Sequence, residues 1–271
     1  MTDRVRFRPF TGDEERKVHM PDAPLALVLA QIRWPEHGRF ARDFKSLALD
    51  FGDKLSDFPL YNEITESGIQ ITPEGVTPIP GETAYQWRTI DDVWTINLTK
   101  NFVSIYCIQH ENYGFSELQR YTNLVAELLE SSLNVRSIDR IGLRYVNRVS
   151  DPSVLQELGT IFSPAVLGYA QLQVLPGVTP VSNISQGVYQ VEDVLLQARS
   201  GMLAPGQTID PAIPAVNRPS WVLDIDASIE KRRVFDPTDL ESALGKLADT
   251  AYDFFKLVLH EGGEDRLDGS A

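Results

Sequence analysis

The chain has 271 residues, of which 42% are hydrophobic, and its formal net charge at pH 7 is -13. This much hydrophobic material can bury a large core, which excludes a disordered chain. The negative charge is concentrated in residues 151–271, with 17 acidic and 8 basic side chains, and argues against general nucleic-acid binding, because neutralising phosphates requires a basic surface.

The single cysteine and the apolar segments indicate the compartment. Cys107 lies in the apolar run FVSIYCIQ and has no second cysteine to pair with, which fits a reducing environment. The N-terminal residues are charged throughout and lack the apolar segment of a signal peptide, and the longest apolar run, LALVLA, is too short to span a bilayer. We therefore expect a cytoplasmic protein that does not enter a membrane.

The first half of the chain contains both strand and helix patterns. Residues 25–34 (LALVLAQIRW) predict a buried strand, and apolar residues at helical spacing predict a helix over 39–55. Residues 68–82 are so rich in Pro and Gly that they predict a long loop around one short strand. An antiparallel meander is predicted over residues 84–90, 93–99 and 102–109, followed by a helix from about Ser116.

The second half begins with an apolar segment, SVLQELGTIF, and strands are predicted near residues 169–175, 186–192 and 194–203. The Pro-rich residues 204–219 are interpreted as a surface excursion or a mobile lid. Residues 220–230 (SWVLDIDASIE) alternate between apolar and polar side chains, which predicts a strand with one buried face. A long amphipathic helix is expected from Thr238 to about His260.

Together these elements indicate an α+β fold, with a large antiparallel sheet and about three helices packed on one face. The pattern leaves open a division into two similar halves. Residues 1–150 would then form an N-terminal α+β half and residues 151–271 a C-terminal α+β half, packed on the same sheet as a single compact unit.

A row of arginines lies in RSIDRIGLRYVNRVS, residues 136–150. Alternation in a strand places Arg136, Arg140, Arg144 and Arg148 on one face, while Ile141, Leu143, Tyr145 and Val149 point to the other. Like charges on neighbouring positions of one face repel unless a counter-charge neutralises them. The row must therefore be paired, either within the protein or with a ligand.

The acidic row of the predicted strand 220–230 supplies an internal partner. Asp224, Asp226 and Glu230 share its polar face, and bidentate arginine–carboxylate pairs would fix the register between two strands. We favour this interpretation. In the alternative, Arg140, Arg144 and Arg148 bind phosphate, a nucleotide, nucleic acid or an acidic protein surface. Arg4, Arg6 and Arg8 in RVRFRPF predict a second alternating basic strand, which is less easily explained.

Motifs typical of the commonest enzymes are missing from the chain: GxGxxG, GxxxxGK[ST], GxSxG, HExxH and CxxC. His37 and His110, the latter followed by Glu111, each lie between a predicted strand and a helix and are candidates for acid–base catalysis. Asp224 and Asp226 are spaced to share a divalent cation if a third ligand is present. We expect no cofactor.

Three segments carry a resemblance to known proteins: PDAPLALVLAQIRW, RIGLRYVNRV, and WVLDID followed by a long C-terminal helix. They resemble a sporadically distributed family of uncharacterised bacterial and archaeal proteins of about the same length. The resemblance covers nearly the whole chain but brings no activity and no site residues with it. A patchy distribution implies an association with mobile elements, toxin–antitoxin pairs or phage defence.

These observations favour a non-enzymatic interaction protein, acting as a regulatory, antitoxin-like or phage-defence component through its charged sheet face. We expect a protein partner encoded nearby, and homo-oligomers are left open. A nucleotide- or phosphate-ligand-binding protein or enzyme that uses the arginine row is the first alternative. A metal-dependent nuclease that uses Asp224 and Asp226 is the second.

Overall fold

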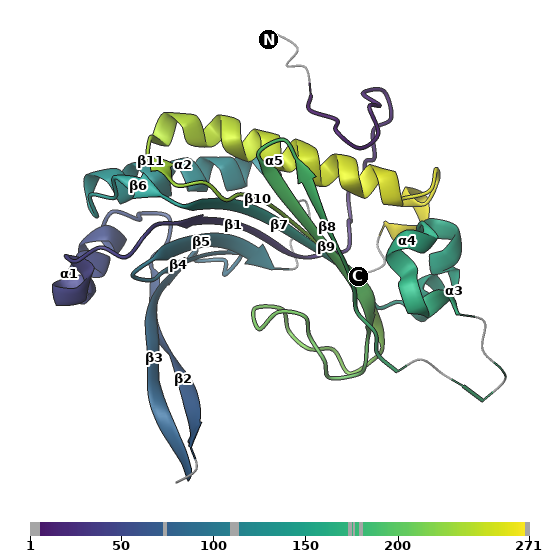
Figure 1. Ribbon diagram of the computed structural model, residues 1–271, viewed down its shortest axis with the longest axis horizontal. Helices are drawn as coiled ribbons and strands as arrows, with labels where there is room; N and C mark the ends of the chain where they lie inside the picture. Colours follow the sequence, from purple (N-terminus) through teal and green to yellow (C-terminus); the bar gives the residue numbers. More distant parts are fainter. Residues whose placement is uncertain are drawn as a thin grey trace.

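The computed structural model describes residues 6–268 apart from 73–74, 109–113, 173–174, 176 and 179–180, and for 66–82 and 171 it describes the backbone alone. One antiparallel sheet of nine strands forms its centre (Figure 1), in the order β2-β3-β4-β5-β1-β7-β10-β9-β8. The bounds of these strands are β1 (Leu25–Arg33), β2 (Leu60–Thr72), β3 (Gly75–Arg88), β4 (Trp94–Leu98), β5 (Phe102–Ile108), β7 (Arg140–Val149), β8 (Ser185–Val191), β9 (Val194–Leu203) and β10 (Ser220–Ile229).

Short elements and helices complete the fold. A separate two-stranded sheet consists of β6 (Ser137–Ile138) and β11 (Arg233–Val234). The helices are α1 (Phe40–Gly52), α2 (Phe115–Ser131), α3 (Pro152–Ile161), α4 (Pro164–Leu167), the 3-10 helix η1 (Gly168–Gln171), α5 (Pro237–Val258) and α6 (Glu264–Leu267). The predicted α+β class with a large antiparallel sheet is confirmed.

Three helices pack against the same face of the sheet. Phe51 of α1 lies with its ring centroid 5.7 Å from that of Trp87 in β3, and Tyr121 of α2 lies 5.3 Å from Trp94 in β4. The apolar face of α5 joins the same core, and Figure 1 shows α2 and α5 side by side above the central strands. We call this face of the sheet the helix face and the opposite one the polar face.

Residue alternation in the two central strands β7 and β10 separates these faces. Leu223, Ile225 and Ala227 of β10 are buried in the core beneath the helices, as predicted. Asp224 and Asp226 point to the polar face, where β10 pairs in antiparallel register with β7, Asp226 opposite Arg144. The acidic row and the arginine row are therefore on adjacent strands and on one face.

The two halves of the sheet meet at the central pair β1 and β7. On one side β5, β4, β3 and β2 follow β1, and on the other side β10, β9 and β8 follow β7. On each side a strand leads into helical structure, then into a meander, and then into a long helix, α2 or α5. Both halves thus contribute strands to a single sheet.

Two of the predicted elements are wrong. Residues 68–72 and 75–82 belong to the paired strands β2 and β3, not to a loop, and a register shift between Thr65 and Ser67 shows where the pairing is irregular. Proline has no backbone N–H to donate to a neighbouring strand. Pro78 and Pro80 are tolerated because β3 pairs with β4 only through residues 85–88, which leaves the side of β3 away from β2 unpaired at these two positions. The strand predicted at 169–175 is also absent from the described residues there, where η1 ends at Gln171.

Candidate functional site

Arg144 lies at the centre of the polar face and is held by three carboxylate contacts. Its Nε donates to Asp224 Oδ1 over 2.8 Å and its Nη2 donates to Asp224 Oδ2 over 3.0 Å, while Nη1 donates to Asp210. Only 1% of the Asp224 side chain is exposed, and Arg199 of β9 binds the same carboxylate. Burial alone would lower the pKa of Arg144, but the hydrogen bonds and charges of Asp224 and Asp210 raise it above its ordinary value.

Arg140 is bound in a similar way at the next position of the row. Its Nη2 lies 2.9 Å from both carboxylate oxygens of Asp226, its Nε donates to Glu230 over 3.3 Å, and its Nη1 donates to Gln31 over 2.9 Å. The guanidinium group lies across Gly142, where an added Cβ would approach Nη1 to 2.2 Å. Burial raises the pKa of Asp226, and the charges of Arg140 and Arg144 oppose this rise.

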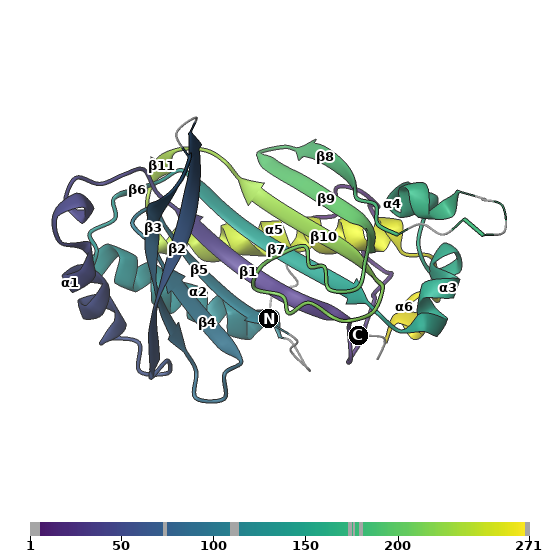
Figure 2. The same ribbon diagram turned by 90° about the horizontal axis from the view of Figure 1, so that it is seen from below.

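Arg148 binds the Pro-rich segment in place of a carboxylate. Its Nη1 donates to the carbonyl oxygen of Pro214 over 2.7 Å, its Nη2 to that of Gln207 over 3.1 Å, and its Nε to Ser220 Oγ over 3.1 Å. Burial lowers the pKa of Arg148. Figure 2 shows the segment 204–219 crossing the polar face beneath the central strands, where Ile213 packs against Val146.

The predicted internal pairing of the arginine row is therefore confirmed for Arg140 and Arg144. Arg148 fixes residues 204–219 against the sheet, so this segment covers the polar face. Arg136 does not belong to the row, because β7 begins at Arg140, and its side chain is 70% exposed. Binding of an external ligand by Arg140, Arg144 and Arg148 stays a prediction, and it would have to displace these bonds.

The other candidates that the structure describes do not come together into a site. His37 accepts a hydrogen bond on Nδ1 from the backbone of Arg39 over 3.3 Å and lies against Phe40 at the start of α1. His110 and Glu111 lie outside the described residues. Asp224 and Asp226 are bound to arginines, and in the described part of the chain no group of three His, Cys, Asp or Glu side chains could hold a metal ion.

Cys107 is buried in β5, as the sequence predicts for a small apolar residue. Burial raises the pKa of its thiol to about 12. The thiol is therefore protonated at neutral pH and is a poor nucleophile.

A cavity of about 680 Å³ lies on the opposite side of the same strands, on the helix face. Its floor is formed by β1, β7 and β10, one wall by α5, and one end by Phe115 of α2. Gly245, Ala248 and Ala251 of α5 have small or no side chains, which leaves room for the cavity along this helix. The lining residues are Arg6, Arg8, Val18, His19, Met20, Pro21, Ala23, Leu25, Phe115, Tyr145, Asn147, Ile225, Gly245, Ala248, Asp249, Ala251, Tyr252 and Phe255.

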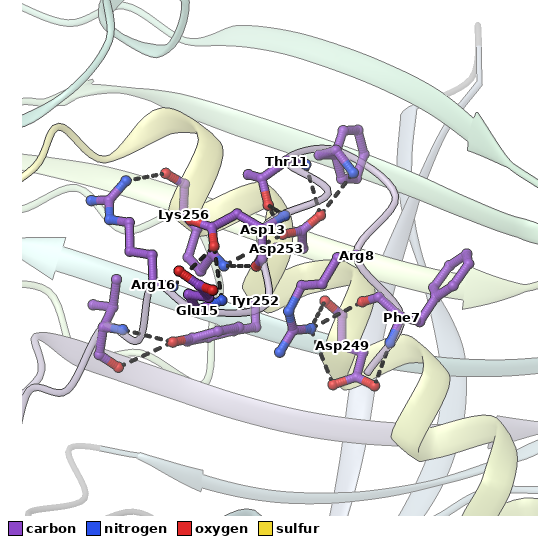
Figure 3. A network of polar contacts seen from close by, with 12 residues as sticks. Phe7, Arg8, Thr11, Asp13, Glu15, Arg16, Asp249, Tyr252, Asp253 and Lys256 are labelled. Atoms are coloured by element: carbon purple, nitrogen blue, oxygen red, sulfur yellow. Dashed lines mark hydrogen bonds and ion pairs between the residues drawn. The ribbon is translucent and has the colours of Figure 1, made fainter. Parts of the chain in front are cut away.

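The roof of the cavity is an irregular segment, residues 6–24, which we call the N-terminal strap. The strap runs along α5 and is fixed by helix side chains on successive turns (Figure 3). Asp249 accepts from the backbone N of Phe7 over 3.2 Å, and Asp253 accepts from the backbone N of Phe10 over 2.7 Å and of Thr11 over 3.0 Å. The sequence predicted a strand for Arg6 and Arg8, but the described residues here form no strand, because the strap bonds to helix side chains rather than to a sheet edge.

Buried charges at the end of α5 complete the attachment of the strap. Asp253 is 0% exposed and Lys256 1% exposed, and Lys256 Nζ donates to the carbonyl oxygen of Asp13. Tyr252 accepts from the backbone N of Val18 over 2.7 Å, and Arg16 donates to the carbonyl oxygen of Leu259 over 3.1 Å, near the end of the helix. Most of the strap's bonds thus run to charged and polar side chains of α5, and Glu264 of α6 and Asp268 add two further contacts.

Asn147 is the polar residue in the floor of the cavity. It lies on β7 opposite Leu25 of β1 and Leu223 of β10, and it is only 5% exposed. Within the part of the chain that the structure describes, its side-chain amide has no hydrogen-bond partner. An amide that lines a cavity and has no partner among the described residues is available for a hydrogen bond with a bound molecule or with water.

Sequence reasoning missed this site, although two signals of it were present. Asn147 interrupts the apolar face of β7 between Tyr145 and Val149, and a polar residue at such a position needs an explanation. Asp253 and Lys256 lie close to the apolar stripe of α5 and are fully buried. The strap itself carries no regular pattern, and its partners are more than 200 positions away in the sequence.

Because comparison with family models and curated proteins gives no match, the functional proposal for this chain rests on the geometry of the molecule. No family model matches the chain, and no curated protein matches its sequence. Among the described residues, no helix combines the length and apolar character required to cross a membrane.

Proposed function

We propose that the protein binds a small organic molecule in the cavity beneath the N-terminal strap. The volume of about 680 Å³ lies within the range of ligand pockets in proteins, roughly 300–1,000 Å³. A cavity of this size with a few polar groups in mostly apolar walls is typical of sites for small molecules. The observation that carries the proposal is the amide of Asn147, which lines the cavity between apolar side chains and forms no hydrogen bond with the described residues.

The amide explains why a ligand would stabilise the protein. A hydrogen bond that replaces one to water contributes about 0.5–1.5 kcal/mol net, so a ligand atom that bonds to Asn147 would add stabilisation of this order. Leu25, Ile225 and Phe255 surround the amide with apolar surface, which favours a ligand with an apolar body. The apolar walls would thus supply most of the binding free energy, and the hydrogen bond to the Asn147 amide would orient the ligand.

The strap provides a route of entry. Most of its anchoring bonds run to side chains of α5 rather than to a β-ladder, so it can lift from the helix without breaking the sheet. Irregular segments held in this way belong to the parts of a protein that open most readily. A ligand would enter when the strap lifts and be covered when it returns.

Filling the cavity is expected to abolish binding of an apolar probe. N-phenyl-1-naphthylamine is neutral, carries an N–H that can donate to Asn147, and fluoresces in apolar surroundings. In Ala248→Trp the new indole occupies the space next to α5, so the dissociation constant for the probe should rise about tenfold or more. Fluorescence titration of wild type and variant measures the change.

Ser242→Trp is the matched control, because Ser242 lies on the exposed side of the same helix. This variant should bind the probe as wild type does. Urea denaturation of both variants must first show cooperative unfolding. The proposal fails if folded wild type does not bind the probe, or if Ala248→Trp binds it with unchanged affinity.

A further inference from the structure

We infer that the molecule bound in the cavity carries an anionic group, a carboxylate, sulfonate or phosphate, which Arg8 of the strap recognises. This inference rests on the proposed binding site and adds the chemical class of the ligand. It follows from the hydrogen bonds of Arg8, from its burial and from the charges around it.

In the described part of the chain, Arg8 donates hydrogen bonds through one of its three nitrogens, and its guanidinium group also lies over the ring of Tyr252, 5.1 Å from the centroid. Its Nη1 donates to the carbonyl oxygens of Phe7 and Asp249 over 3.0 and 3.3 Å, and to Asp249 Oδ1 over 3.2 Å. Among the described residues every hydrogen bond of this side chain runs from Nη1, and Nε is buried without a partner. An arginine has five N–H donors, so those of the Nε–Nη2 edge are not used.

The unused edge is the one whose geometry suits an oxyanion. Nε and Nη2 of an arginine point in parallel and bind two oxygens of a carboxylate or phosphate at once, as Arg144 binds Asp224 in this protein. Only 5% of the Arg8 side chain is exposed, so water does not fully satisfy these donors. Arg8 lines the cavity with this edge unpaired, and because Nε is shielded from solvent, an anion would reach the edge when the strap lifts.

The local charge supports the same chemistry. Arg6, Arg8 and His19 line the strap side of the cavity, and Asp249 is the acidic residue of the lining. Asp249 is already bound to Arg8 and to the backbone of Phe7. The cavity therefore has a basic end in a protein with a formal net charge of -13. The apolar floor lies beyond this end, which fits an amphipathic ligand with one anionic group.

Two dyes with the same ring system test the inference. 8-Anilino-1-naphthalenesulfonate has the naphthyl and phenyl rings of N-phenyl-1-naphthylamine and adds one sulfonate. Wild type should bind the sulfonate dye about tenfold or more tightly than the neutral dye, because charge-assisted bonds to a buried arginine are strong. In Arg8→Met this advantage should disappear, so that the affinities for the two dyes lie within about twofold of each other.

Arg8→Lys serves as the second variant, because a lysine can keep the ion pair with Asp249 that holds the strap but lacks the second donor edge. The ratio of sulfonate-dye affinity to neutral-dye affinity should fall below that of wild type. Equal affinity of wild type for both dyes, or an unchanged affinity ratio in both variants, would overturn the inference and leave the cavity site standing. Failure of the neutral dye to bind wild type would instead overturn the proposed function.

Discussion

Replacing Arg144 by methionine is expected to lower the free energy of unfolding by about 3–5 kcal/mol, the usual cost of removing one partner of a buried ion pair. Asp224, with 1% of its side chain exposed, would lose the two bonds of 2.8 and 3.0 Å and retain only its contact with Arg199. The methionine keeps the apolar part of the side chain, so the decrease in the free energy of unfolding reflects the removal of the guanidinium group. Urea denaturation measures it.

Arg136→Met is the matched control for this prediction. The Arg136 side chain is 70% exposed, and its Nη1 lies 3.7 Å from Oε1 of Glu130. Its replacement should therefore change the free energy of unfolding by less than about 0.5 kcal/mol. If Arg144→Met proves no more destabilising than Arg136→Met, the arginine row is not held by its internal partners. Its role as an anion site would then regain support.

Replacing Asp253 by leucine is expected to release the N-terminal strap. The backbone N–H groups of Phe10 and Thr11 and the hydroxyl of Thr11 would lose their acceptor, and Lys256, which is 1% exposed, would lose the nearby carboxylate. We expect a loss of about 3–5 kcal/mol in the free energy of unfolding, because a buried charge is left uncompensated. Urea denaturation and limited trypsin digestion of the native protein measure the two effects.

Trypsin should cleave after Arg16 much faster in Asp253→Leu than in wild type, since Arg16 is held by carbonyl oxygens near the end of α5. Glu241→Leu, an exposed position on the same helix, should leave the cleavage rate unchanged. Protection of Arg16 in Asp253→Leu equal to that in wild type would contradict the role of Asp253 as the anchor of the strap.

The polar face was predictable from the sequence because strand alternation has a period of two. The positions of Arg140, Arg144, Asp224 and Asp226 follow from that period once two strands are neighbours. The alternation does not reveal Asp210 and Arg199, which come from an irregular segment and another strand. The interaction role expected for this face stays a prediction. An external partner would have to compete with the ion pairs that these arginines and carboxylates already form with one another.

The cavity was not predictable in the same way. A strap without regular structure leaves no periodic pattern, and its bonds connect residues near the two ends of the chain. The hairpin β2–β3 was missed for a related reason, because Pro78 and Pro80 argue locally against a strand and are tolerated only where one side of the strand is unpaired. In both cases the tertiary partner, not the local sequence, decides the structure.

Nuclear magnetic resonance of the side chains tests the central claim most directly, because β7 presents Asn147 to the cavity and Arg144 to the opposite face. The amide signals of Asn147 can be assigned by their loss in Asn147→Leu. Titration with N-phenyl-1-naphthylamine should shift these signals and leave the Nε–H signal of Arg144 in place. A shift of the Arg144 signal without a shift of the Asn147 amide would contradict the claim and place the binding site on the polar face.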